Sequence, residues 1–532
     1  MELTARRKLQ VLTEFPPAYV LGLVGLIGVA AWGFYVWAGQ QLVTGLGVTG
    51  MNEPTYWGAY IVNFVFFVGL SAGGIVVSAL VHALRIERYR PVARVAEVVA
   101  IIAILLAGIF ISLDIGRPDR LWHLVRYGSW ESPLIWDLFI MAAYLGMALA
   151  LGYFSTREDI VRCMRDIPSR AGLYRLLALG YTDVSPAALQ RDRVILRVVA
   201  FASIPGAVLL HSITAWILGL AKATPGWHTS LLAPLFVGSA LVSGLALVMV
   251  AADLSRRLFK AEVPEETIAQ LGRLLTILVP VLGYFLFSEL LTVVYAQEVS
   301  PSAFFEEIIT GDYALFFWFD LMVGLVAPLL ILVYVWWAPR LAAAEVPAPR
   351  PALVPEHAVL ARGLGLTLAA AAAVLVIVSF FVFANRPTQA GLGGEQLSPS
   401  GTGLAIALNA LAAAGLVFLA TRLRAAAAIG LAGFLVVAGV LAERINIVLA
   451  PQFTRFSAQP EETFALPYVM PSYAPTWQEM SIVAGVYALG VLGFVVFAKI
   501  FPLVELGEEA EARAAPERER WGYEPEAERE AR

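Results

Sequence analysis

Long apolar runs of about twenty residues, separated by short polar segments, make up most of the chain. A helix of about 20 apolar residues crosses the hydrocarbon core of a bilayer, and helices satisfy their own backbone hydrogen bonds there. The pattern therefore predicts an all-α, multi-pass membrane protein of about twelve helices. The expected spans are residues 18–38, 57–82, 92–113, 134–154, 194–220, 231–252, 271–296, 313–337, 359–384, 402–421, 425–449 and 479–501.

Composition supports the same class. Hydrophobic residues make up 59% of the 532 and charged residues only 15%, whereas a soluble protein carries about 25% charged residues. The net charge of −4 and the lack of a basic patch give no indication of nucleic-acid binding. The single cysteine, Cys163, excludes an internal disulfide and a cysteine-ligated iron–sulfur cluster within the chain. The first apolar run, 18–38, is too long for the core of a signal peptide and is expected to remain as a helix.

Loop charges predict the orientation. With the N-terminus inside, the inner segments hold 20 Lys and Arg residues and the outer loops hold six. Cytoplasmic loops are the ones enriched in Lys and Arg, so both termini are expected inside, in a prokaryotic inner membrane. The Arg-rich segment Thr156–Arg193 is expected to form an amphipathic helix on the cytoplasmic surface, in contact with anionic lipid.

The chain divides into four expected parts. Residues 1–337 hold the first eight spans, and 338–424 hold a Pro-rich linker (346–355) followed by two Ala-rich helices that resemble an insertion. Residues 425–504 hold the last two spans, and 505–532 form a charged cytoplasmic tail. The run Gly69–Gly74, GLSAGG, is expected to pack closely against another helix, with contact to a substrate as the alternative.

The segment Leu113–Asp137, LDIGRPDRLWHLVRYGSWESPLIWD, joins two spans on the outer side. It combines acidic and basic side chains with three tryptophans, and indole rings favour the boundary between hydrocarbon and water. We interpret it as the mouth of a site at the membrane surface.

Polar residues within the spans concentrate towards this outer side, and charges in hydrocarbon are costly enough to suggest function. They are Asn63, Asp114, Asp137, His211, Glu289, Asp320, Glu443, Arg444 and Glu479. Structural alternatives remain open: Glu443 and Arg444 can pair with neighbouring helices, His211 can be a packing histidine, and Asp137 can be a helix-terminal charge. Fewer polar residues are expected towards the inner side, namely His82, Glu97 and Asp253.

Haem is not expected, because a membrane haem commonly needs two facing histidines and only His211 lies well inside a span. No metal-ligand spacing is recognisable either.

Five stretches taken together resemble the NrfD/PsrC-like family of membrane subunits of polysulfide-reductase-type oxidoreductases. They are YWGAYIVNFVFFVGLSAGG (56–74), LDIGRPDRLWHLV (113–125), HSITAWILGLAKATPGWHTSLLAPLFVGSAL (211–241), ERINIVL (443–449) and YAPTWQE (473–479). The resemblance implies a haem-free subunit that binds quinone near the outer face. It also implies a docked ferredoxin-like iron–sulfur subunit, with a molybdopterin catalytic subunit or a multihaem cytochrome beyond it. Two features depart from the family: Trp57-Gly58 stands where some members have Trp-Asn, and twelve spans exceed the usual eight or ten.

Quinone chemistry fits these residues. A quinone headgroup needs hydrogen-bond donors for two carbonyl oxygens and an acid or base that exchanges protons. Asp114, His123 and Glu289 are expected to exchange protons. The residues expected to bind the headgroup or line its site are Asn63, Asp114, Arg117, Arg120, His123, Asp137, His211, Asp320, Glu443 and Arg444. The sequence thus favours a quinone-binding subunit of a respiratory oxidoreductase. Coupling of its quinone chemistry to proton transfer is a variant of this hypothesis. A secondary transporter with buried carboxylates and a purely structural anchor are the alternatives.

Overall fold

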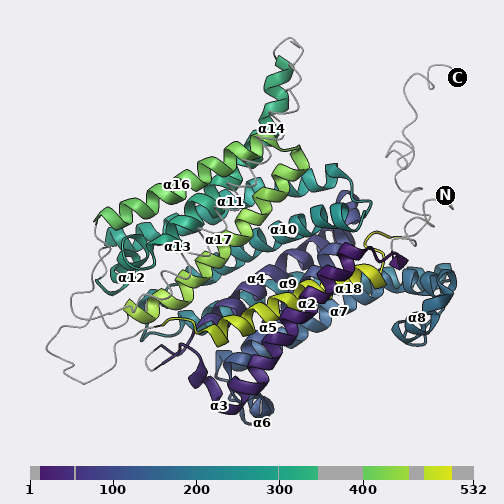
Figure 1. The fold of residues 1–532 in the computed structure, drawn as a ribbon, viewed down its shortest axis with the longest axis horizontal. Coiled ribbons are helices and arrows are strands. Elements are labelled where there is room, and N and C mark those ends of the chain that lie inside the picture. The colour runs from purple at the N-terminus through teal and green to yellow at the C-terminus, as the bar shows by residue number, and fades with distance from the viewer. Residues whose placement is uncertain (1–11, 53–54, 297–298, 345–398, 455–472, 506–532) are drawn as a thin grey trace.

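The computed structural model describes residues 12–52, 55–296, 299–344, 399–454 and 473–505, and their regular structure is entirely helical (Figure 1). Eleven helical stretches in these ranges are long and apolar enough to cross a membrane. The helices that form them are α2 (Pro17–Val36), α4 (Ala59–His82), α5 (Arg90–Asp114), α7 (Pro133–Asp166), α9 (Pro186–Gly219), α10 (Leu232–Leu258), α11 (Glu265–Ala296), α13 (Ala314–Phe319) with α14 (Ala327–Ala344), α16 (Pro399–Arg422), α17 (Ala425–Thr454) and α18 (Trp477–Ile500).

Shorter elements connect or extend these helices. They are the π-helical η1 (Trp37–Gln41) and η7 (Asp320–Val326), the 3-10 turns η2 (Gly45–Val48), η3 (Glu87–Tyr89), η4 (Pro118–Arg120), η5 (Pro168–Arg170) and η6 (Pro225–Trp227), and the short helices α3 (Leu42–Thr44), α6 (Trp122–Tyr127), α8 (Ala171–Leu177) and α12 (Val299–Ile309). The segment η7 joins α13 to α14 without a break.

The all-α, multi-pass prediction is confirmed, and eleven of the predicted spans coincide with these helices. The remaining predicted span, 359–384, lies outside the described residues. So do the predicted linker 346–355 and the charged tail from residue 506 onward.

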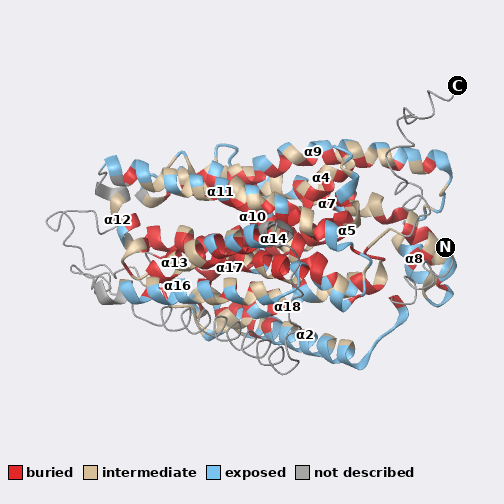
Figure 2. Ribbon diagram, turned by 90° about the horizontal axis from the view of Figure 1, so that it is seen from above, coloured by how far each residue is buried: buried red, intermediate tan, exposed pale blue. Residues whose placement is uncertain are grey.

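Helices α4 and α10 form the centre of the bundle. Helix α4 packs against α5, α9 and α10, and α10 packs in turn against α11 and α17. Helix α18 packs against α5 and α2 packs against α18, while α16 packs against α13 and α14. Buried residues gather on the central helices, and α2, α11 and α16 present exposed apolar faces (Figure 2). Because α4 is apolar all round and is enclosed by protein, it suits the position of a central helix.

The close contacts of α4 with α10 and with α5 depend on glycine. A Cβ on Gly73 would lie 1.9 Å from the backbone carbon of Gly244, and one on Gly74 would lie 2.1 Å from the carbonyl oxygen of Ala96. Small residues allow helix backbones to approach this closely in membranes. The predicted packing role of the GLSAGG run is therefore confirmed.

We expect Gly73→Ala to force α4 and α10 apart and to lower the free energy of unfolding by about 1–3 kcal/mol, the range for overpacked sites. Gly69→Ala is the matched control, because the nearest atom its Cβ would meet is the hydroxyl oxygen of Ser243, at 3.8 Å. Thermal unfolding in detergent measures both variants. Equal midpoints for the two variants would contradict the glycine requirement.

The segment 156–193 differs from its prediction. Instead of one amphipathic surface helix, α7 continues to Asp166, the seven-residue α8 follows, and α9 begins at Pro186. Pro168 and Pro186, together with the left-handed backbone at Leu179 and Gly180, divide the segment. The apolar residues of α8 do not form one buried stripe, since Tyr174 is buried whereas Leu173 and Leu176 are exposed.

The two ends of the bundle carry different polar groups. The end that holds residues 113–137 is named the loop end here. At the opposite end, the arginine end, Arg94 donates to Asp159 at 2.5 Å and to the carbonyl oxygen of Pro502 at 2.9 Å. Lys499 there donates to the carbonyl oxygen of Glu14 at 2.7 Å. The start of α2 and the end of α18 therefore lie at the same end.

Candidate functional site

The segment 113–137 closes the loop end beside α5 and α7. Helix α5 ends at Asp114, and Gly116 follows with a φ of +68°, a value that favours glycine. A Cβ at Gly116 would also meet the side chain of Leu46 at 2.8 Å. After η4 and α6, helix α7 begins at Pro133. The segment is thus tightly turned at its start and helical through much of its length.

A buried polar cluster lies where α5 meets α4 and η1. The Tyr60 hydroxyl donates to the side-chain oxygen of Gln41 at 2.6 Å, and the Gln41 amide donates to the carbonyl oxygen of Leu113 at 2.9 Å. Asp114 follows directly, and its Oδ1 atom is buried without a hydrogen-bond partner among the described residues. A buried acceptor without a partner is costly. Asp114 is therefore the residue of this cluster that is available to a ligand.

Glu479 is the second carboxylate of this region and is fully buried. Its Oε1 accepts from the hydroxyl of Tyr473 at 2.6 Å and from the backbone N–H of Ala59 at 3.2 Å. Its Oε2 accepts from the N–H of Gly50 at 3.2 Å. Asp114 and Glu479 also interact electrostatically with each other and with Tyr60. Gln41, Tyr60, Asp114 and Glu479 are called the Asp114 cluster below.

Other predicted residues on this side of the bundle have structural partners. The Asn63 amide donates to the carbonyl oxygen of Ala59 at 2.8 Å, and its oxygen accepts from the Tyr487 hydroxyl at 2.7 Å. His211 is buried, and its two ring nitrogens lie 2.6 and 3.2 Å from the carbonyl oxygens of Ala207 and Val68. These contacts favour a packing role for His211.

Asp137 is buried in α7 and accepts from the Thr214 hydroxyl of α9 at 2.7 Å. Asp137 therefore bonds to a neighbouring helix and is more than a charge near the start of its own helix. It lies on the α7 and α9 side of the bundle, apart from the hydrogen bonds of the Asp114 cluster.

The three remaining loop residues lie at the surface. Arg117 and Arg120 are exposed, and Arg117 pairs with Asp119 at 3.1 Å. His123 is half-buried in α6, and its ring packs against Trp122 and Tyr127. Within the described part of the chain, no hydrogen bond or ion pair joins these residues to Asp114.

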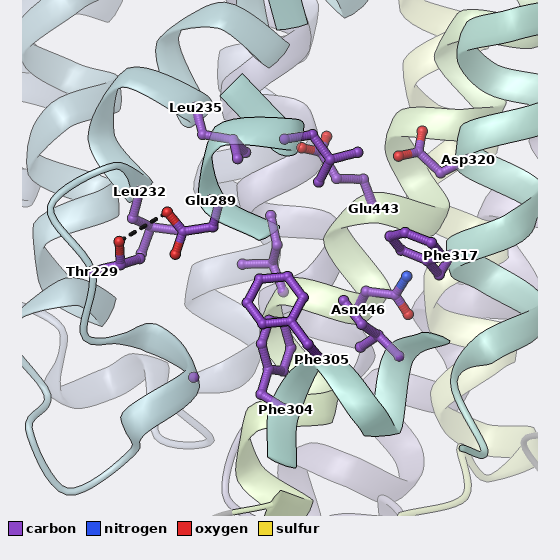
Figure 3. A pocket seen from close by; sticks show the side chains of 14 residues that line it. Thr229, Leu232, Leu235, Glu289, Phe304, Phe305, Phe317, Asp320, Glu443 and Asn446 are labelled. Atoms are coloured by element: carbon purple, nitrogen blue, oxygen red, sulfur yellow. Dashed lines mark hydrogen bonds between the residues drawn. The ribbon is translucent and has the colours of Figure 1, made fainter. Parts of the chain in front are cut away.

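The other four predicted residues belong to a different part of the bundle. Glu289, Asp320 and Glu443 line a pocket among α10, α11, α12, η7 and α17 (Figure 3). The hydroxyl of Ser239 donates to Glu443 at 2.5 Å and accepts from Arg444 at 2.8 Å. The structure therefore separates residues that the sequence places at one depth into two groups.

A π-helical segment places Asp320 in this pocket. Asp320 opens η7, and its Oδ1 lies against Gly324 and Gly439, where a Cβ would approach it to 2.9 and 3.0 Å. Gln41 of the Asp114 cluster likewise ends the π-helical η1. Single π-helical turns are frequent at functional sites. The Asp114 cluster and the pocket therefore each include a residue from a π-helical turn.

Helix α12 covers the pocket with Phe304, Phe305 and Ile308. Beyond it, Glu307 accepts from the backbone N–H of Asp312 at 3.0 Å. Burial, followed by the nearby Asp312 carboxylate, raises the pKa of Glu307 to about 7. Glu307 lies on α12, the helix that covers the pocket, and outside the membrane-spanning helices.

At the arginine end, Glu97 has close partners. Its Oε1 accepts from the Ser78 hydroxyl at 2.8 Å and lies 3.0 Å from the Nε2 atom of His82. The Ser155 hydroxyl also donates to Glu97. Glu97 is buried and is held by these three side chains.

Sequence reasoning missed several members of both groups. Tyr60 is a polar residue within the predicted span 57–82, a signal that could have identified it, whereas Gln41 lies beyond the end of the predicted span 18–38. Asn446 lies within the ERINIVL stretch and lines the pocket. The cover by α12 had no comparable signal, because an 11-residue helix is too short for a span.

The family model described as "Polysulphide reductase, NrfD" matches residues 47–344. The chain is 35% identical over 314 residues to a putative membrane subunit of dimethyl sulfoxide reductase from Halobacterium salinarum, a match that covers 59% of this chain and 68% of that protein. It is 27% identical to a selenate reductase subunit from Mesobacillus selenatarsenatis, over 59% of this chain and 73% of that protein. It is 28% identical to the Hdr-like menaquinol oxidoreductase integral membrane subunit of Archaeoglobus fulgidus, over 59% and 70%.

These relatives and the eleven apolar helices identify a multi-pass prokaryotic membrane protein that serves as a membrane subunit of a redox complex. The matched residues include both the Asp114 segment and the α10–α14 side of the pocket. The chain belongs to the polysulphide reductase NrfD family.

Proposed function

We propose that this subunit binds quinone and quinol at the Asp114 cluster and exchanges electrons with an iron–sulfur subunit docked at the loop end. The observation that carries the proposal is Asp114 itself. Its carboxylate lies at the end of a transmembrane helix, and one oxygen is buried without a partner among the residues described. Such a group is costly unless a ligand or a proton satisfies it.

The donors that surround Asp114 suit a quinone headgroup. When bound, a quinone takes up two electrons and two protons and becomes a quinol. Beside Asp114, the Tyr60 hydroxyl donates to the Gln41 oxygen and orients this amide, whose second N–H, besides the one donated to Leu113, can serve a headgroup oxygen. Asp114 is the group placed to hold a proton for the headgroup oxygen, whereas Glu479 is committed to three structural donors. Apolar residues of α5 that are exposed, such as Leu105, offer a surface for an isoprenoid tail.

The surface of the loop end supports docking of a partner. Trp122 is 54% exposed and Trp130 is 67% exposed, and Arg117, Arg120 and Arg126 are exposed beside them. Tryptophan and arginine are enriched at protein–protein contacts. A ferredoxin-like iron–sulfur subunit bound here would bring its cluster near Asp114, with a molybdopterin subunit or a multihaem cytochrome beyond it.

The orientation follows from the distribution of charge. The arginine end carries Arg90, Arg94, Arg157 and Arg170, and Lys499 lies with them. Positive residues favour the cytoplasmic side. We therefore place the arginine end inside and the loop end outside, which puts the iron–sulfur partner on the outer face.

Extraction of quinone from the purified subunit tests the proposal. We expect about one tightly held quinone per chain, and we expect Asp114→Asn to weaken its binding by about tenfold, the effect of losing one charged hydrogen bond. Asp119→Asn is the matched control, because Asp119 is exposed on the same segment and pairs with the exposed Arg117. Wild-type protein that retains no quinone, or equal retention by the two variants, would refute the site.

A further inference from the structure

The pocket lined by Glu289, Asp320 and Glu443 lies apart from the Asp114 cluster. Helices α10, α11, α12, α13 and α17 and the segments η6 and η7 form its walls, and it is partly open to the outside. None of Gln41, Tyr60, Asp114 and Glu479 is among its described lining residues. The proposed quinone site therefore leaves this pocket without a role.

Most polar groups of the pocket are hydrogen-bond acceptors, namely three carboxylates and the Asn446 oxygen, and its side-chain donors are the Thr229 hydroxyl and the Asn446 amide. Figure 3 shows Thr229 and Glu289 together on one side and Glu443, Asp320 and Asn446 across from them. Thr229 donates to Glu289 at 3.0 Å. No Lys, Arg or His occurs among the described residues that line the pocket. A ligand that presents acceptors only, such as a carbonyl compound, would find few donors here.

Asn446 gives an independent indication of a ligand. Its side chain is 5% exposed and lines the pocket, and its Oδ1 atom has no hydrogen-bond partner in the part of the chain that the structure describes. Buried amide oxygens are normally satisfied. An O–H or N–H group in the pocket would supply the missing donor.

The apolar walls specify the rest of the ligand. Phe304, Phe305 and Phe317 line the pocket with leucine and isoleucine side chains, which suits a flat aromatic body. The phosphate of a phospholipid would be repelled by the carboxylates. A metal ion is not favoured either, since the described residues contain no group of three or more His, Cys, Asp or Glu arranged to hold one.

We propose that this pocket is a second site that binds quinol, the reduced carrier with two hydroxyl donors, in preference to quinone. The inference rests on the proposed function, because it assumes that the subunit handles this carrier. The two sites then differ in chemistry: near Asp114 the Gln41 amide has a second N–H besides the one that it donates to Leu113, whereas the carboxylates and the Asn446 oxygen of this pocket are acceptors. Discrimination between the redox states follows, because a buried acceptor rejects a ligand that lacks the matching donor.

Binding of menadiol and menadione to the full chain in lipid nanodiscs tests the second site under anaerobic conditions. We expect two equivalents of menadiol and one of menadione per chain. Asn446→Leu and Glu289→Gln should each weaken the second menadiol equivalent by about tenfold, the effect of one hydrogen bond to a buried or charged acceptor. Menadione binding should not change in either variant, and this also shows that the variants are folded.

The outcomes separate the two proposals. One equivalent of each compound, lost in Asp114→Asn but unchanged in the pocket variants, would overturn the second site and leave the proposed function intact. A second menadiol equivalent that both pocket variants leave unchanged would also overturn it. Failure of wild-type protein to bind either compound would overturn both proposals.

Discussion

Glu479→Gln is expected to lower the free energy of unfolding by about 3 kcal/mol or more, since each buried donor left without an acceptor costs about 1–3 kcal/mol. The carboxylate accepts from the N–H groups of Ala59 and Gly50 and from the Tyr473 hydroxyl. A glutamine keeps one oxygen but turns an NH₂ group towards one set of these donors. The start of α4 and the segments before α4 and α18 should loosen together, because this side chain joins them.

Chemical unfolding of the purified protein in detergent measures this loss. Glu131→Gln is the matched control, because Glu131 is an exposed glutamate at the same end of the bundle, and it should stay within about 0.5 kcal/mol of wild type. Hydrogen exchange at Gly50 and Ala59 adds a local readout, since the amide that faces the new NH₂ group loses its carboxylate acceptor. Protection at these two amides that matches wild type would contradict the role assigned to Glu479.

The sequence was sufficient to predict the spans and one helix contact. Apolar runs report length and burial directly, and the run Gly69–Gly74 reports a close helix approach that the structure confirms at Gly73. The sequence also predicts how deep each polar residue lies in the membrane, because the position of a residue along a span corresponds to its depth. These properties depend on residues close together in the chain.

Position in the plane of the membrane could not be read in the same way. Asp114 and Asp320 were assigned to one site because they share a depth, yet they lie in different groups of helices. Which helices are neighbours depends on packing between distant segments, such as the contact of Gly324 with Gly439. The π-helical turns that carry Gln41 and Asp320 likewise arise from tertiary packing and leave no periodic signal.

The difference between closeness in sequence and closeness in space also explains why some predicted site residues lie at the surface. Arg117 and His123 were assigned to headgroup binding because they lie near Asp114 in the sequence. In the structure, Arg117 is exposed with Asp119, and His123 packs against Trp122. Gly116 turns the chain away immediately after Asp114. These side chains therefore suit the docking surface better than the interior of the site. Comparing quinone binding by variants at Asp114 and at Arg117 would measure this difference.

Arg444→Met is expected to cost about 3–5 kcal/mol of unfolding free energy, the range for removing one partner of a buried ion pair. Arg444 is only 1% exposed, donates to Ser239 at 2.8 Å, and lies over the ring of Phe236 at 4.5 Å. Its Nη1 atom is 3.7 Å from the Glu443 carboxylate. Methionine replaces the aliphatic stem of arginine but not its guanidinium group, so that carboxylate is left without a nearby positive charge.

A second substitution separates charge from packing. In Glu443→Gln/Arg444→Met the uncompensated carboxylate is gone, so the double variant should be more stable than Arg444→Met alone. The single variant Glu443→Gln completes the double-mutant cycle that gives the coupling between the two side chains. Arg424→Met controls for loss of an exposed arginine near the start of the same helix. If the double variant is no more stable than the single one, the loss comes from the Phe236 contact and the Ser239 hydrogen bond. A double variant that is more stable than Arg444→Met would instead show that Arg444 compensates the charge of Glu443. Glu443 lines the pocket, whereas Arg444 is not among the described residues that line it.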